Sequence, residues 1–174
     1  MGCTRVEERV AAAFGKLKEA RVEFPFALDV RFGGVLFALP VLLINGLLRH
    51  SEKHFSLPNG FYGLSRIFIL IAFMALCRIK SIEGLRRCPP GDLGKLLGLD
   101  RVPEVRTLRE KLEHLCERGD VSEWSADLSR DWMAGNPDLA GYLYVDGHVR
   151  VYHGRQTKLP KRYVARERLC LRGT

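Results

Sequence analysis

The feature that most constrains the fold is an almost unbroken apolar stretch, Leu64–Ile79, in which Arg66 and Arg78 are the only charged residues. A helix that is apolar on all sides must be surrounded by other parts of the protein, so this stretch predicts a central helix. Its charge-free part, Ile67–Cys77, has 11 residues, whereas a membrane span needs about 20. A membrane helix is therefore the weaker alternative, here and in the apolar segment Gly33–Leu48.

Helical patterns extend over most of the chain before residue 135. Apolar residues recur at helical spacing from Val6 to Leu17 and from Val121 to Trp132. The apolar segment Gly33–Arg49 predicts a helix that is bent near Pro40, because proline lacks the N–H that a helix interior needs. A short helix is expected to follow Ser81, whose hydroxyl can cap it.

Two predicted helices between residues 92 and 117 follow the helix-turn-helix pattern. Asp92 can cap the first helix, and the second begins at Pro103-Glu104 after the turn GLDRVP. The inward apolar residues are Leu93, Leu96 and Leu97 in the first helix and Val105, Leu108, Leu112 and Leu115 in the second. Near the start of the second helix, where a recognition helix contacts base edges, lie the candidate DNA-binding residues Arg106, Arg109 and Lys111. A pair of ordinary bundle helices is the alternative, because nearby glutamates dilute the positive charge.

A carboxylate stands in the middle of a predicted strand, Tyr142–Tyr152 (YLYVDGHVRVY). Alternation places its apolar residues on one face and its tyrosines and polar residues, Asp146 included, on the other. Asp-Gly is also a strong turn signal, so a hairpin with Asp146-Gly147 at its tip is the alternative, although it would mix apolar and charged side chains on each face. Because aspartate is rare inside strands, we interpret Asp146 as a candidate metal ligand.

The residues after this aspartate are strongly basic. From His148 to Thr174 there are eight lysines and arginines and one acid, Glu167. Together with a net charge of +8, this density indicates a polyanionic partner such as DNA. A solvated loop and an outer strand face are the alternative. The candidate DNA-binding residues of this region are Arg150, Arg155, Lys158, Lys161 and Arg162.

Three stretches of the sequence resemble bacterial insertion-sequence transposases of the DDE class. They are residues 57–115 (beginning LPNGFYGLSRIF), 124–133 (WSADLSRDWM) and 141–174 (GYLYVDGHVRVYHGRQTKLPKRYVARERLCLRGT). The resemblance implies an α+β, mostly α fold. A helical DNA-binding region over residues 1–135 would precede the first strands of an RNase H-like catalytic domain over residues 141–174.

The resemblance also implies a catalytic and metal-binding role for Asp146, which matches the family's first catalytic acid. An intact family enzyme would transfer DNA strands with divalent ions, for which Mg²⁺ suits the all-oxygen ligands. The family's second Asp and final Glu would follow Thr174, so the chain is expected to be truncated, to bind DNA and to lack a complete active site. Exposed edges of an incomplete sheet favour a homo-oligomer. A non-enzymatic helical DNA-binding or adaptor protein is the alternative function.

The five cysteines are scattered along the sequence, with no C-x-x-C pair and no histidine at ligand spacing. This usage indicates reduced, structural thiols rather than a zinc site or a disulfide framework. The first residues also lack the apolar region of a signal peptide. We therefore expect a cytoplasmic protein with no membrane partner.

The 174-residue chain is expected to show no Mg²⁺-dependent cleavage or joining of DNA, because one carboxylate cannot hold the paired metal ions that in-line phosphoryl transfer needs. The measurement is incubation of the purified chain with labelled DNA and Mg²⁺ or Mn²⁺, with Asp146→Ala as the control. Cleavage by the chain that is absent from the control would mean that another acid completes the site.

Overall fold

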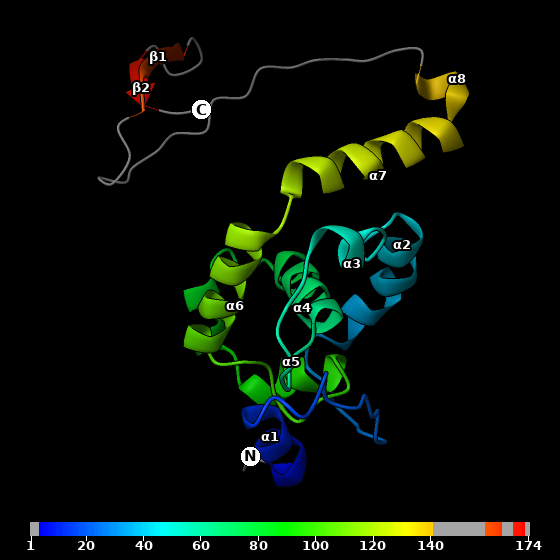
Figure 1. Cartoon of the computed structure of the whole chain (residues 1–174), viewed down its shortest axis with the longest axis vertical. Coiled ribbons are helices and arrows are strands. Elements are labelled where there is room, and N and C mark those ends of the chain that lie inside the picture. Colours follow the sequence, from blue (N-terminus) through cyan, green and yellow to red (C-terminus); the bar gives the residue numbers. More distant parts are fainter. Residues whose placement is uncertain (1–3, 141–158, 165–168, 173–174) are drawn as a thin grey trace. The chain divides into compact units, whose positions relative to one another are not determined.

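The computed structural model describes residues 4–140, 159–164 and 169–172. The chain divides into two compact units, Met1–Ala134 and Gly135–Thr174 (Figure 1). The described part of the first unit is helical, and that of the second contains a short helix and a two-stranded antiparallel ladder. The fold is therefore α+β and mostly α, as predicted.

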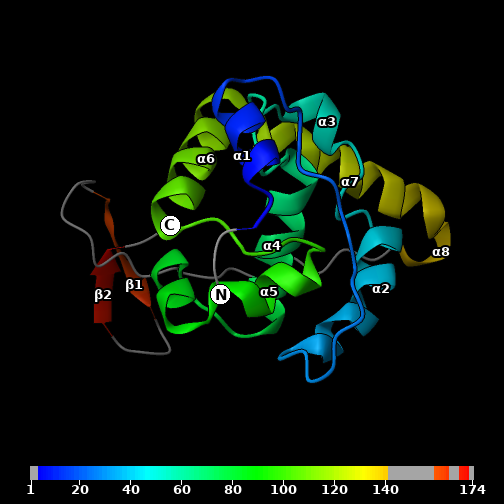
Figure 2. The same ribbon diagram turned by 90° about the horizontal axis from the view of Figure 1, so that it is seen from below.

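The first unit is built around α4 (Leu64–Leu76), which confirms the predicted central helix. Ile67, Leu70 and Phe73 of α4 are 0% exposed, and Figures 1 and 2 show the helix in the middle of its neighbours. Ile71 and Leu76 reach the surface, at 40% and 44% exposed, while the rest of this apolar helix is largely covered, as it must be in water. The core around α4 also includes Phe55, Phe61, Tyr62, Leu85, Leu93, Leu96, Leu108 and Leu115.

The other helices of this unit lie around α4. They are α1 (Val6–Ala13), the 3-10 helix η1 (Gly33–Ala38), α2 (Leu39–Ile44), α3 (Ser51–His54), the 3-10 helix η2 (Ile82–Arg87), α5 (Pro90–Leu96), α6 (Val105–Arg118) and α7 (Val121–Gly135). The short helix expected after Ser81 is therefore present as η2, although the Ser81 side chain accepts no capping hydrogen bond. The helix expected from Val121 is present as α7.

Two predicted helices differ from the structure. The first helix ends at Ala13, and its apolar stripe points outward, since Val10 is 49% and Phe14 is 73% exposed. The predicted bent helix over residues 33–49 is a 3-10 helix followed by the separate helix α2. Pro40 explains this break, because proline is tolerated in the first turn of a helix and not in its interior.

The α5–α6 pair forms with the predicted inward faces. Leu93, Leu96 and Leu97 are buried, as are Val105, Leu108 and Leu115, and Leu112 is partly buried against the core. Helix α5 begins at Pro90, so Asp92 lies in the first turn and is not the cap. The linker after α5 packs closely on Gly94, where a Cβ would lie 2.5 Å from the Arg101 Cα.

Trp124 is one of the residues that anchor helix α7 on the rest of the first unit. The Trp124 ring makes edge-to-face contacts with Phe55 and with Phe68 of α4, with ring centroids 5.7 and 5.6 Å apart. Its indole N–H donates a hydrogen bond to the Arg49 carbonyl oxygen at 2.8 Å. This geometry places an aromatic body in the core while its polar N–H finds an acceptor.

A buried carboxylate adds a polar anchor for α7. Asp127 is 8% exposed, and its Oδ2 lies 2.6 Å from both Lys53 Nζ and His54 Nε2. Arg130 donates to its other oxygen. These hydrogen bonds, the one from Lys53 foremost, hold the pKa of Asp127 below its ordinary value. One turn further along, Asp131 pairs with His50 Nε2 at 2.9 Å.

The second unit contains α8 (Pro137–Ala140) and the strands β1 (Lys161–Val164) and β2 (Leu169–Arg172). The strands are antiparallel, with Lys161 opposite Arg172 and Val164 opposite Leu169. Within the described residues of this unit, the two short strands pair with each other. The predicted strand around Asp146, and its hairpin alternative, lie outside the described residues.

Replacing Phe73 by Ala is expected to destabilise the protein by about 3–5 kcal/mol, since it leaves a cavity beside residues that cannot collapse into it. The measurement is the free energy of unfolding in urea. Phe37→Ala is the matched control, because Phe37 is 88% exposed. Equal losses in the two variants would contradict the central position of α4.

Replacing Asp127 by Asn is expected to destabilise the protein at pH 7 and to reduce the loss of stability in acid. The folded pKa of Asp127 is depressed below 3.8. Its ionised form therefore contributes stability that is present above this value and disappears as the pH falls below it. Melting temperatures from pH 7 to pH 2 should converge for wild type and variant, whereas exposed Glu117→Gln should follow wild type throughout. A constant gap would contradict the prediction.

Candidate nucleic-acid interface

The predicted DNA-binding residues of α6 differ in their accessibility. The Arg106 side chain is 87% exposed and its Nε lies 2.9 Å from Glu110 Oε1. Arg109, also exposed, pairs with Glu83 of η2. Lys111 is partly buried, and this burial lowers the pKa of its ammonium group. Two of the three predicted residues are thus open to solvent, and both share their charge with an acid.

A pocket of about 350 Å³ lies at the start of α6. Its lining combines apolar residues, Leu85 and Val105 among them, with the charged residues Arg86, Arg101, Glu104 and Arg106. Arg86 comes from η2, Arg101 and Glu104 come from the linker that precedes α6, and Arg106 comes from α6 itself. The pocket therefore joins the three segments η2, linker and α6 on one surface.

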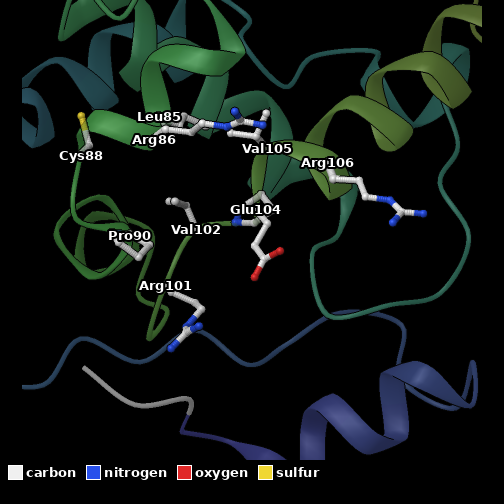
Figure 3. A pocket seen from close by; sticks show the side chains of 10 residues that line it. Leu85, Arg86, Cys88, Pro90, Arg101, Val102, Glu104, Val105 and Arg106 are labelled. Atoms are coloured by element: carbon white, nitrogen blue, oxygen red, sulfur yellow. The ribbon is translucent and has the colours of Figure 1, made fainter.

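The arginines around this pocket do not point at a common centre. Figure 3 shows Arg86 reaching toward the start of α6, while Arg101 and Arg106 point in different directions away from the pocket. The Glu104 carboxylate lies between them. Such a spread of cations does not enclose one small anion, but it can contact separate charges of an extended polyanion.

The second unit presents the predicted residues of β1. Lys161 is exposed, and Tyr163, two residues further along the strand, is 65% exposed. Arg162 lies between them in β1, opposite Leu171 of β2. Exposed aromatic and basic residues on neighbouring positions are typical of surfaces that bind nucleic acid.

Several predicted site residues are outside the described part of the chain. They are Asp146, Arg150, Arg155 and Lys158. Among the residues that the structure does describe, no group of three or more His, Cys, Asp or Glu could hold a metal ion. The predicted ligand Asp146 is not among these residues, so Mg²⁺ binding stays a prediction. In the same described ranges, no helix has the length and apolar character needed to cross a membrane.

Sequence reasoning missed Arg86, Arg101 and the acid Glu83. Residues 78–87 (RIKSIEGLRR) contain four cations and one acid between an apolar helix and a proline pair, and this charge run was the available signal. The pairing of Glu83 with Arg109, 26 residues away, leaves no local pattern in the sequence.

Comparison with known proteins gives one match. The family described as "Transposase protein" matches residues 1–174, which is the whole chain. No curated protein matches the chain, and no solved structure matches it.

Proposed function

The chain belongs to a family of transposases, and we propose that it binds DNA through the start of α6 and through the basic residues of its C-terminal region. The observation that carries this proposal is the exposure of Arg106 and Arg109 in the first half of α6, the part of a recognition helix that contacts base edges. In this proposal α5 and α6 act as a helix-turn-helix.

The acids beside these arginines do not prevent contact with DNA. Arg106–Glu110 is a solvent-exposed pair, with side chains 87% and 58% exposed. An exposed ion pair contributes only about 0–1 kcal/mol, so exchanging the carboxylate for a phosphate or a base edge costs little. Arginine gains from the exchange, because it can donate two parallel hydrogen bonds to guanine or to phosphate.

The second part of the proposal concerns Arg150, Arg155, Lys158, Lys161 and Arg162. Their density within a short segment is what supports a role in contacting the DNA backbone. Tyr163 is exposed beside two of them and offers a ring for stacking. Backbone contacts of this kind would contribute affinity, and α6 would contribute base recognition.

The proposal extends to the chemistry of the family. We propose that the chain is related to insertion-sequence transposases of the DDE class with an RNase H-like catalytic domain. Asp146 would then be the first catalytic acid and one ligand of Mg²⁺. These assignments rest on the sequence around Asp146.

A homo-oligomer is also part of the proposal. Several large apolar residues of the first unit are exposed, among them Phe26 at 91%, Phe37 at 88% and Ile44 at 74%. Association of two copies of the chain would cover such exposed apolar side chains. A cytoplasmic location remains a prediction from the cysteine usage.

Duplex DNA is expected to bind with an affinity that falls steeply as salt rises, because binding releases counterions from the phosphates. Replacing Lys158, Lys161 and Arg162 with Ala should lower the affinity and flatten the salt dependence by up to about 2.7 in log–log slope, at about 0.9 per lost phosphate contact. The measurement is fluorescence anisotropy of labelled DNA between 50 and 200 mM salt, about the range over which such losses are large. Binding that does not change with salt, or no binding at low salt, would contradict the proposal.

The control for this experiment carries the same change in charge. Lys16, Lys18 and Arg21 are exposed cations of the segment after α1. Their replacement with Ala removes three positive charges from a surface that the proposal does not use. A flattened salt dependence in this control as well would mean that net charge, rather than the C-terminal residues, governs binding.

Arg106→Ala should weaken binding unequally for DNA duplexes of different sequence. A base contact of arginine is worth about 1–3 kcal/mol of discrimination. The measurement is the ratio of the affinities of wild type and variant across a pool of random duplexes. A uniform loss across the pool would assign Arg106 to the DNA backbone and would argue against α6 as the reading helix.

A further inference from the structure

We propose that η2 and the end of α4 form a second DNA contact, one that binds the sugar-phosphate backbone and reads no bases. This inference rests on the proposed DNA binding and names a surface that the sequence predictions did not include. We call this surface the η2 ridge. Its residues are Arg78, Lys80, Arg86 and Arg87.

The η2 ridge contributes to two neighbouring pockets. Arg86 lines the pocket of about 350 Å³ at the start of α6. The next residue, Arg87, lines a second pocket of about 470 Å³, together with Arg78 and Lys80. Cys88 lines both pockets, so they adjoin at this residue. Consecutive arginines of η2 thus supply positive charge to two neighbouring hollows.

The four cations of the η2 ridge are open to solvent. Arg78, Lys80, Arg86 and Arg87 are all exposed. Among the described residues, none of these four side chains makes a hydrogen bond or an ion pair within 4 Å, in contrast to Arg9, which pairs with Asp100 at 2.7 Å, and to Lys53, which pairs with Asp127. The nearest acid in sequence, Glu83, is bound by Arg109. A backbone hydrogen bond, the contact with Arg109 and the charge of Arg86 lower the pKa of Glu83. The ridge therefore offers its cations to a ligand from outside.

Arg78 occupies a strained backbone position at the end of α4. It has φ +57, in the left-handed region that favours glycine. It ends α4 in a Schellman motif, in which Ile79 N–H bonds the Met74 carbonyl at 2.8 Å and Arg78 N–H bonds the Ala75 carbonyl at 3.0 Å. Glycine would fit this position with less strain, so an arginine here costs stability.

The arrangement of cations favours a strand of phosphates over a single anion. Arg86 lines one pocket and Arg87 the next, and the arginines around the first pocket diverge (Figure 3). One bound phosphate would require donors that converge. A nucleic-acid backbone instead presents phosphates at regular intervals, which divergent cations on a ridge can contact one by one.

The first test compares two double variants by anisotropy with labelled duplex DNA. Arg86→Gln with Arg87→Gln should reduce the slope of log affinity against log salt by about 1.8, for two phosphate contacts at about 0.9 each. The loss of affinity should be the same on two duplexes of unrelated sequence, because phosphates carry no sequence information. Lys16→Gln with Arg21→Gln is the charge-matched control and should leave the slope near that of wild type.

The second variant separates binding from folding. Arg78→Gly removes a charge and suits the left-handed backbone, so it should raise the melting temperature and at the same time lower the DNA affinity. A variant that is weakened only because it is misfolded cannot give this pair of results. Inorganic phosphate, added at constant ionic strength, should not displace the DNA better than chloride does.

Each outcome bears on the η2 ridge separately from the proposed function. If wild type binds DNA and the Arg86/Arg87 variant behaves like its control, the ridge is wrong and DNA binding by α6 and the C-terminal region stands. A loss confined to one duplex, or displacement by millimolar inorganic phosphate, would also overturn the ridge, because it would indicate base reading or a site for a small anion. If wild type shows no salt-dependent DNA binding, both proposals fall.

Discussion

Burial of α4 is the constraint on which the rest of the first unit depends. Thirteen residues with a single charge, Arg66, cannot be left in water, so the surrounding helices must each present an apolar face to them. Phe55, Leu85 and Leu108 come from different parts of the chain and meet in this core. Because α4 ends at the surface, the chain leaves the core at Arg78 and continues directly into the basic segment that includes η2.

The parts of the fold that the sequence predicts well are those with local periodicity. The central helix and the inward faces of α5 and α6 are visible as apolar spacing, and tertiary packing uses them without change. The exposure of the apolar face of α1 could not be predicted. Whether Val10 is buried depends on which other element packs against it, and not on the sequence of α1 itself. The packing of α7 could not be predicted from the sequence either. Asp127 has the pattern of an ordinary surface acid within its helix, and its hydrogen-bond partner His54 lies 73 residues away in the sequence.

In the candidate site, too, the residues that could be predicted are those that follow a local pattern. Exposure of Arg106 and Arg109 follows from helical geometry once the buried stripe is known, and it was predicted. Their partners Glu110 and Glu83 set how these arginines can act, and only the second of these partners needs the fold. The η2 ridge was not predicted, because a short 3-10 helix has no apolar stripe long enough to indicate which of its sides faces water. Apolar periodicity therefore did not identify the cations of the η2 ridge, whose side chains have no ion-pair partner among the described residues. The predicted arginines Arg106 and Arg109 must each break an ion pair with a glutamate before they can bind DNA.

The contact between Gly94 and the backbone of Arg101 has a consequence for how this sequence can drift. Alanine in the middle of a helix is favoured over glycine by about 1 kcal/mol, so an isolated α5 would gain from the exchange. Here the added Cβ would meet the Arg101 Cα at 2.5 Å and push the linker away from the helix. Helix propensity therefore favours alanine at residue 94, whereas the packing of the linker against α5 requires glycine. A Gly94→Ala substitution would therefore require a simultaneous change in the path of the linker that leads to α6. Gly94 cannot be replaced by alanine through one substitution alone.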